Sequence, residues 1–266
     1  STLDRSSAAS DVYKRQLYGS AYALSQLSGP LLLGLVGSEG DYGFWIGVAL
    51  LTLAPLLLMG REGAPVTEAY SVTFKDLLGF CRGLPAIAWA VGLFAAFEAM
   101  ILTLLPVYCL RQGFTADIAL AMVSTVVVGD ALLQLPIGAL ADRLSRRSLF
   151  TGCAVLLMLS SLAVPLLLDT LLIWPLWVIF GASAGGLFTL SLILIGERYR
   201  DDALVRANAH IAQLWGIGCL IGPLAAGAGS QWISGHALPL FMAAGALVLV
   251  ILVLRQGAFG AEQTAA

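Results

Sequence analysis

Eight long apolar segments constrain this chain more than any other feature. A helix needs about 20 mostly apolar residues to cross roughly 30 Å of hydrocarbon. The segments reach that length, do not alternate as barrel strands do, and leave no polar face for water. They lie at 17–37, 42–60, 86–110, 116–140, 148–168, 171–196, 207–232 and 237–255. The sequence therefore predicts an all-α polytopic membrane protein with eight transmembrane helices.

Composition agrees with this class. The chain is 59% hydrophobic and 11% charged, whereas a soluble domain carries about 25% charged residues. The net charge of −2 argues against nucleic acid as a partner. The four cysteines show no CxxC or Cys/His spacing, so we interpret them as packing residues and expect no metal and no cofactor. The expected partners are the lipid bilayer, a small-molecule substrate of unknown identity and protons.

Lysine and arginine predict the orientation. Excluding the first 16 residues, ten of them fall on one side of the predicted helices and only Arg111 falls on the other. The positive-inside rule makes the richer side cytoplasmic. This side contains the longest connection, which includes a weakly amphipathic stretch from Thr73 to Phe80 that favours a short surface helix. The linker and the C-terminus are therefore predicted to be cytoplasmic, at a bacterial inner membrane.

The first 16 residues differ from the remainder because they are polar and have no apolar period. They resemble a translated sequencing-adapter scar, and the alternative is a genuine cytoplasmic loop. The predicted organisation is a non-native leader (1–16), two helices (17–60), a cytoplasmic linker (61–85), a six-helix bundle (86–255) and a cytoplasmic tail (256–266).

An internal repeat relates the first and seventh predicted helices. GPLLLG and GPLAAG occur 193 residues apart, and chance is the alternative reading because both residue types are common in membrane helices. Glycine permits close helix contact, and proline breaks a backbone bond that neighbours must satisfy. The residues expected at these helix contacts are Gly29, Pro30, Gly34, Gly222, Pro223 and Gly227. Six helices separate the copies, as in a duplicated six-helix plan, so the first two helices are expected to be numbers five and six, with helices one to four missing.

The connection after the fourth predicted helix reads GALADRLSRR. It resembles the signature loop of the major facilitator superfamily, in its second-half copy. The flanking stretches EAMILTLLPVYCLRQGFTADIALAMV and WGIGCLIGP are similar to a bacterial efflux-type subfamily. The resemblance implies an incomplete form of that fold, with two helices of the first bundle and all six of the second, and transport by alternating access. It assigns a cytoplasmic gating role to Gly138, Asp142, Arg143, Arg146 and Arg147, and Arg206 could join them.

Two acids lie deep within apolar segments. Glu98 is about 18 Å from Ala86 and Asp130 about 15 Å from Leu140, at about 1.5 Å per residue, so both are near mid-depth. No lysine or arginine occurs at that depth in the predicted helices. Burial without a cation favours the neutral acid, and intramembrane acids mark ion or substrate paths. We hypothesise that one of them couples proton flow to transport; for Asp130 the alternative is a polar contact with a neighbouring helix.

Three further residues each have two possible roles, and a fourth has an expected position. Gln134 and Gln213 could line a substrate cavity or hydrogen-bond between helices. Trp215 could contact substrate or anchor its helix, and His210 is expected near the cytoplasmic interface.

The sequence contains no HExxH, GxSxG or Walker pattern, so an enzyme is not expected. The favoured function is a proton-coupled antiporter that exports a small molecule. The alternatives are an importer of a sugar or organic acid and a non-transporting sensor. The chain alone is not expected to transport, because half of the cavity wall would be missing.

Overall fold

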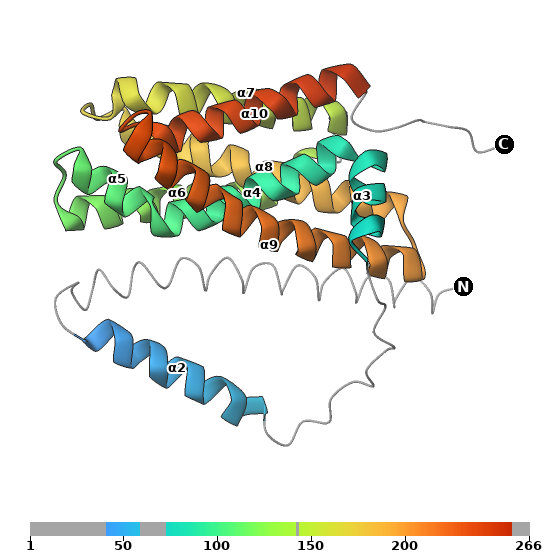
Figure 1. Cartoon of the computed structure of the whole chain (residues 1–266), viewed down its shortest axis with the longest axis horizontal. Coiled ribbons are helices and arrows are strands. Elements are labelled where there is room, and N and C mark those ends of the chain that lie inside the picture. Colours follow the sequence, from blue (N-terminus) through green and yellow to red (C-terminus); the bar gives the residue numbers. More distant parts are fainter. Residues whose placement is uncertain (1–40, 59–72, 142–143, 257–266) are drawn as a thin grey trace. The chain divides into compact units, whose positions relative to one another are not determined.

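The computed structural model describes residues 41–58, 73–141 and 144–256 (Figure 1). The chain divides into two units, residues 1–61 and 62–266, and each is considered by itself. The predicted leader, the helix expected at 17–37, residues 61–72 of the linker and residues 257–266 of the tail lie outside the described residues. In the first unit the structure describes α2 (Tyr42–Leu58), an apolar helix that contains an edge-on contact between Phe44 and Trp45.

The second unit is a bundle of long helices joined by short connections. In Figure 1 these helices lie side by side and run in alternating directions. The pairs that pack most extensively are α6 with α8, α4 with α9, and α7 with both α8 and α10. The elements are α3 (Phe74–Gly83), α4 (Pro85–Thr103), α5 (Leu105–Arg111), α6 (Ala116–Ala141), α7 (Arg146–Leu167), α8 (Ile173–Arg198), α9 (Asp201–Trp232) and α10 (Ala237–Gln256). The described part of the chain is all-α.

Five of the described helices are long and apolar enough to cross a membrane. They are α4, α7, α8, α9 and α10. The apolar helix α2 is shorter, and α6 has 26 residues, as α8 does. The all-α class is therefore observed, whereas the predicted total of eight transmembrane helices is not reached by the described elements.

Two helix boundaries differ from the sequence prediction. The segment expected as one helix at 86–110 divides at Leu104 into α4 and α5, because Pro106 has no N–H to continue the helical ladder. Helix α9 begins at Asp201 rather than at residue 207. Acidic side chains at a helix N-terminus interact favourably with its dipole, so the helix extends beyond the apolar segment that predicted it.

The turn after α5 has the hydrogen bonds of a Schellman motif. The N–H of Gly113 donates to Leu110 at 3.1 Å, and the N–H of Phe114 donates to Cys109 at 3.1 Å. Gly113 has a φ of 92°, which only glycine adopts without strain. The motif reverses the chain into α6 within four residues.

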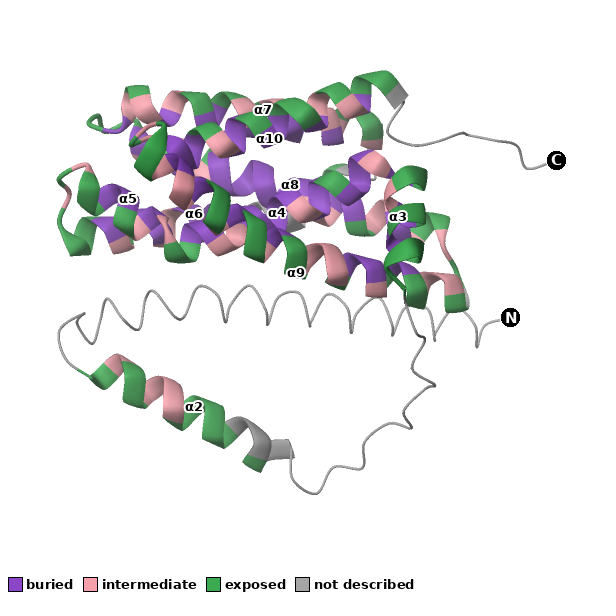
Figure 2. Cartoon of the chain, in the orientation of Figure 1, coloured by how far each residue is buried: buried purple, intermediate pink, exposed green. Residues whose placement is uncertain are grey.

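Burial is concentrated where helices meet. In Figure 2 the buried colour dominates α4 and α8, while α7 and α10 carry much of the exposed colour. The exposed face of α7 carries a row of leucines, Leu156, Leu159, Leu162 and Leu166. A continuous apolar face of this kind would be costly in water and is the face that lipid requires.

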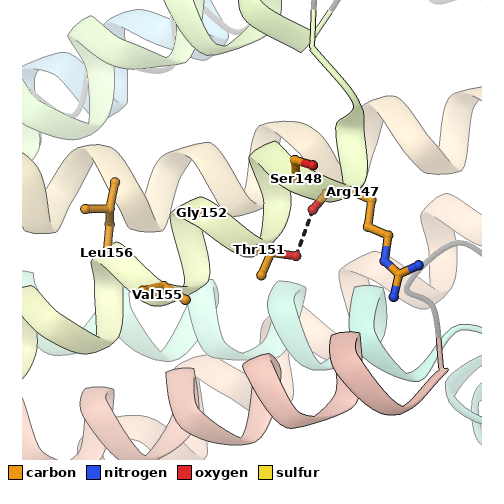
Figure 3. Close-up of a pocket in the computed structure, with 6 residues that line it drawn as sticks. All are labelled: Arg147, Ser148, Thr151, Gly152, Val155 and Leu156. Atoms are coloured by element: carbon orange, nitrogen blue, oxygen red, sulfur yellow. Dashed lines mark hydrogen bonds between the residues drawn. The ribbon is translucent and has the colours of Figure 1, made fainter.

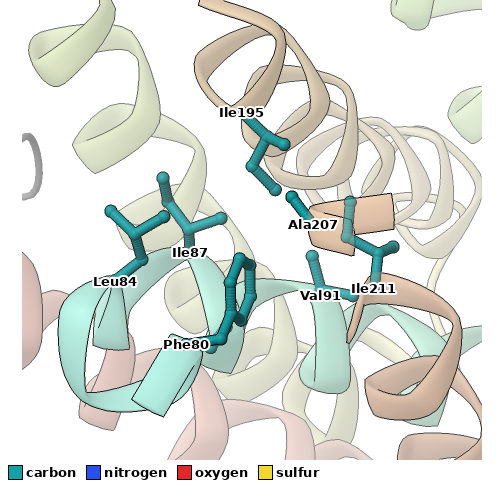
Figure 4. Close-up of a cluster of buried hydrophobic side chains, with 8 residues drawn as sticks. Phe80, Leu84, Ile87, Val91, Ile195, Ala207 and Ile211 are labelled. Carbon is teal, nitrogen blue, oxygen red and sulfur yellow. The ribbon is translucent and has the colours of Figure 1, made fainter. Parts of the chain in front are cut away.

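Helix α3 lies across one end of the bundle, where the amphipathic stretch predicted a short helix. Thr73 and Asp76 form a capping box, with the Thr73 N–H donating to Asp76 Oδ2 at 3.0 Å. The buried face of α3 contributes Phe80 to an apolar cluster with residues of α4, α8 and α9. Figure 4 shows Phe80, Leu84, Ile87, Val91, Ile195, Ala207 and Ile211 in this cluster.

We expect α3 docking to weaken as pH falls. Hydrogen bonds from the Thr73 side chain and backbone hold the pKa of Asp76 below its ordinary value of 3.8. A lowered pKa contributes stability that is present above the ordinary value and is lost as pH falls through the folded-state value. Hydrogen exchange of residues 73–84, corrected for its intrinsic pH dependence, should therefore show faster opening at about pH 3 than at about pH 6.

The variant Asp76→Asn should remove most of this pH dependence. Cys81 offers a second measurement at neutral pH, because burial raises the pKa of its thiol and so slows its reaction with maleimide. Thr73→Ala should accelerate Cys81 labelling, located by peptide mapping, whereas Thr170→Ala, at another exposed hydroxyl, should not. Equal labelling in both variants would contradict a role for the cap in docking α3.

Candidate functional site

Close contacts between small residues position α9 against α4. A Cβ added at Gly218 would meet the backbone oxygen of Gly92, and one added at Gly222 would meet Ala96. The Cys219 thiol donates to the backbone oxygen of Ala95 at 3.6 Å. The absence of a side chain at both glycines lets the two backbones approach. This contact holds the part of α4 that leads directly to Glu98.

A second close contact joins α6 to α8. Added Cβ atoms would meet the backbone of Val178 at Gly129 and the backbone of Val126 at Gly181. At Gly185 the nearest atom would be the carboxylate oxygen Oδ1 of Asp130. Glycine at that position therefore makes room for the acid between two helices. Asp130 is half-buried there.

An aromatic group lies on the same face of α4 as Glu98. Phe94 stacks on Phe188 of α8 with ring centroids 4.7 Å apart and planes 10° apart. Trp215 of α9 meets both rings edge-on, at 5.6 Å from Phe94 and 5.1 Å from Phe188. We call Phe94, Phe188 and Trp215 the aromatic triad. Phe94 precedes Glu98 by four residues, so the two side chains share one helix face.

Helices α4, α8 and α9 thus bring aromatic rings next to a half-buried acid. Glu98, Phe188 and Trp215 are each partly exposed, whereas Phe94 is buried. Of these residues, sequence reasoning identified Glu98 and Trp215 and missed both phenylalanines. The FAAFE run placed Phe94 near the acid, but no local signal could pair it with a residue 94 positions away. An aromatic surface beside an acid is chemically suited to an amphipathic or cationic molecule.

Gln213 has a different environment. Its Oε1 lies 3.0 Å from Nδ1 of His210, which is buried with its ring 5.2 Å from Phe80. The pair therefore belongs to the region where α3 docks on α9. Gln134 belongs to α6, but its side chain lies outside the described residues.

The GALADRLSRR motif contributes one residue to an observed ion pair. Arg146, in the first turn of α7, pairs with Glu197 in the last turn of α8. Arg147 follows Arg146 by one residue, about 100° around the helix, and its side chain is exposed. Asp142 and Arg143 lie outside the described residues, as do the surroundings of Gly138. Arg206 is exposed in the second turn of α9.

The Arg146–Glu197 pair should contribute little to stability. Its side chains are 33% and 44% exposed, and pairs of this kind are typically worth about 0.2–1 kcal/mol. A double-mutant cycle with Arg146→Ala and Glu197→Ala, measured by thermal unfolding in detergent, should give a coupling energy in that range. A coupling above about 3 kcal/mol would instead indicate a fully desolvated pair.

The repeated motif is described only in its second copy. Gly222 lies against Ala96 as stated above, and Pro223 lies within α9. A Cβ added at Gly227 would meet nothing within 4 Å among the described residues. Gly29, Pro30 and Gly34 lie outside the described residues.

A family model described as Major Facilitator Superfamily matches residues 87–262, which is more than half of the chain. The chain belongs to the major facilitator superfamily. The match includes the glycine contacts, both acids, the aromatic triad and the Arg146–Glu197 pair. Together with the apolar helices it identifies an integral membrane protein.

This superfamily member is also similar in sequence to curated bacterial proteins. The Bacillus subtilis protein named uncharacterized MFS-type transporter YfkF is 22% identical over 226 residues, 79% of this chain and 55% of that relative. YE1530 of Yersinia enterocolitica, with the same description, is 24% identical over 242 residues, 90% of this chain and 62% of that relative. YcaD of Salmonella dublin is 23% identical over 241 residues, with the same coverage.

The chain spans about 55–62% of the length of these relatives. Their names describe transporters rather than enzymes. Among the described residues, no group of three His, Cys, Asp or Glu side chains could hold a metal ion.

Proposed function

We propose that this protein is part of a secondary active transporter that moves a small molecule by alternating access. The family match over 87–262 carries the proposal. In this proposal residues 86–255 form the C-terminal bundle, and 17–60 supply the last two helices of the N-terminal bundle. The linker at 61–85 and the tail lie in the cytoplasm, at a bacterial inner membrane.

The substrate site is proposed on the face shared by Glu98 and the aromatic triad. The partial exposure of Glu98, Phe188 and Trp215 supports this placement, because they are accessible when the second unit is considered by itself. An acid carries charge and the rings supply apolar contact, so the site suits an amphipathic molecule. Asp130, held against Gly185 between α6 and α8, is the second candidate for proton exchange.

Gating is proposed at the cytoplasmic ends of α6, α7 and α8. The Arg146–Glu197 pair joins two of these helices. Asp142, with Arg143 and Arg206, would complete a charge cluster that holds the outward-open state and breaks when the bundles rock. Gly138 would supply close helix contact at the same end.

Proton-coupled export is the favoured direction, and import of a sugar or organic acid is the alternative. The aromatic triad supports an amphipathic substrate over a sugar, because the three rings supply apolar contact and few hydrogen-bond partners for hydroxyl groups. A non-transporting sensor would bind ligand without gradient-driven flux.

Everted membrane vesicles can distinguish these functions. The longest open reading frame that contains this chain would be expressed, and the vesicles acidified inside by respiration. Addition of ethidium, an aromatic cation, should release protons from the vesicles if the protein is an exporter of this class. Vesicles preloaded with a sugar or organic acid test the importer, because a symporter would carry substrate and protons out of the acidic lumen together and would not respond to ethidium. Absence of proton release with every compound, despite measurable ethidium binding, would support the sensor and overturn the transporter.

A further inference from the structure

A shallow, open groove, lined by residues of α7 alone, runs along the first three turns of this helix, at the end of the bundle predicted to be cytoplasmic. Its volume is about 540 Å³. Figure 3 shows Arg147 at one end of the groove and Val155 and Leu156 at the other, with Ser148, Thr151 and Gly152 between them. These residues are remote in sequence from the two acids and from the aromatic triad.

The lining changes from charged to apolar along the helix. Arg147 and Ser148 come first, Gly152 follows, and Val155 and Leu156 end the groove. Residues 147 to 156 span about 14 Å at about 1.5 Å per residue. Beyond the groove the exposed leucines of α7 continue the apolar face. The change in polarity along the groove therefore matches that along a phospholipid, which runs from a charged phosphate through glycerol to an apolar acyl chain.

The hydrogen bonds leave suitable donors at the charged end. Arg146 is paired with Glu197, so the two adjacent arginines have separate surroundings. Ser145 Oγ donates to Ser148 Oγ at 2.7 Å, which leaves the Ser148 hydroxyl proton able to donate elsewhere. Thr151 uses its proton on the backbone oxygen of Arg147 at 2.8 Å. A guanidinium fork together with a hydroxyl donor is well matched to phosphate oxygens.

We propose that this groove binds an anionic phospholipid of the cytoplasmic leaflet. Arg147 and Ser148 would hold the phosphate, and the space beside Gly152 would admit the glycerol and upper acyl chain over Val155 and Leu156. Charge complementarity selects this occupant, because cytoplasmic leaflets carry anionic lipid that attracts basic residues at helix ends. The site adds lipid binding to the proposed transport function and does not depend on it.

Native mass spectrometry of the 266-residue chain in detergent tests the proposal. With phosphatidylglycerol added, retained lipid should fall about fivefold in Arg147→Gln, in line with about 1 kcal/mol for one basic residue near an anionic surface. The matched control is Arg200→Gln, which removes another exposed arginine from the same end of the bundle. It should retain lipid as the unmodified chain does, and Arg147→Lys should recover part of the binding.

A second variant tests the groove without changing charge. A Cβ at Gly152 meets nothing within 4 Å among the described residues, so a side chain can start there, and Gly152→Leu is chosen to fill the groove. Leucine also favours helix over glycine, and the thermal unfolding midpoint of the variant in detergent, compared with that of the unmodified chain, checks that it is folded. We expect Gly152→Leu to reduce phosphatidylglycerol binding as strongly as Arg147→Gln does.

Four results would overturn the proposal. Equal losses in Arg147→Gln and Arg200→Gln would show only general surface attraction. Unchanged binding in Gly152→Leu would place the lipid elsewhere. Equal retention of phosphatidylcholine would remove the anionic preference, while competition by glycerol 3-phosphate as effective as that by the lipid would indicate a free phosphate ligand.

Discussion

In the full-length protein, at least one of the substitutions Glu98→Gln and Asp130→Asn is expected to reduce pH-gradient-driven flux to the level of vesicles that lack the protein. Each change preserves the shape of the side chain and removes its ability to exchange a proton. Glu98 shares a helix face with Phe94, and Asp130 lies against Gly185 between α6 and α8. A proton-coupled cycle needs at least one ionisable group near mid-depth, so at least one variant should show the full loss.

The measurement compares flux under a pH gradient with exchange at equal pH on both sides. A variant of a proton-coupling residue should lose the flux driven by a pH gradient. It should retain much of the exchange at equal pH, because substrate binding and the rocking of the two bundles persist without net proton movement. Gln213→Asn is a suitable control, because Gln213 contacts His210 in the region where α3 docks. If both acid variants retain gradient-driven flux, proton coupling through these residues is wrong, although transport itself would stand.

Gly181→Ala is expected to destabilise the bundle strongly. The added Cβ would meet the backbone oxygen of Val126, and backbone atoms cannot move aside as a side chain can. Overpacking costs about 1–3 kcal/mol and occasionally more, and a clash with backbone should lie at or above the upper end. Thermal unfolding in detergent should show a large fall in midpoint temperature, accompanied by separation of α6 from α8.

Gly196→Ala provides a matched control on the same helix. A Cβ there meets nothing within 4 Å among the described residues. Alanine favours helix over glycine by about 1 kcal/mol, so this variant should be slightly more stable than the unmodified chain. The two substitutions therefore have opposite expected signs. Equal stability of the two variants would show that the contact between α6 and α8 is looser than the structure indicates.

The membrane class and the approximate positions of the described long helices could be predicted from the sequence. Apolar length fixes how many residues cross hydrocarbon, and this depends on local composition alone. The weakly amphipathic stretch from Thr73 to Phe80 also located α3, and the GALADRLSRR motif located the loop that carries Arg146. The helix boundaries at Leu104 and Asp201 were harder to predict. A proline can either bend or divide a helix, and polar residues can extend a helix beyond its apolar segment.

Helix pairing was decided by the tertiary structure. Helices α4, α6 and α8 are apolar on nearly every side, so no amphipathic period marks the face that packs. Contacts such as Gly181 with Val126 depend on small residues matching across distant segments. The same is true of the aromatic triad and of the separate surroundings of Arg146 and Arg147. The sequence alone indicated which segments are suited to the membrane, because transfer into hydrocarbon depends on the apolar length of a segment. Only the packed bundle decided which side chains meet, because those contacts depend on the shapes of facing helices.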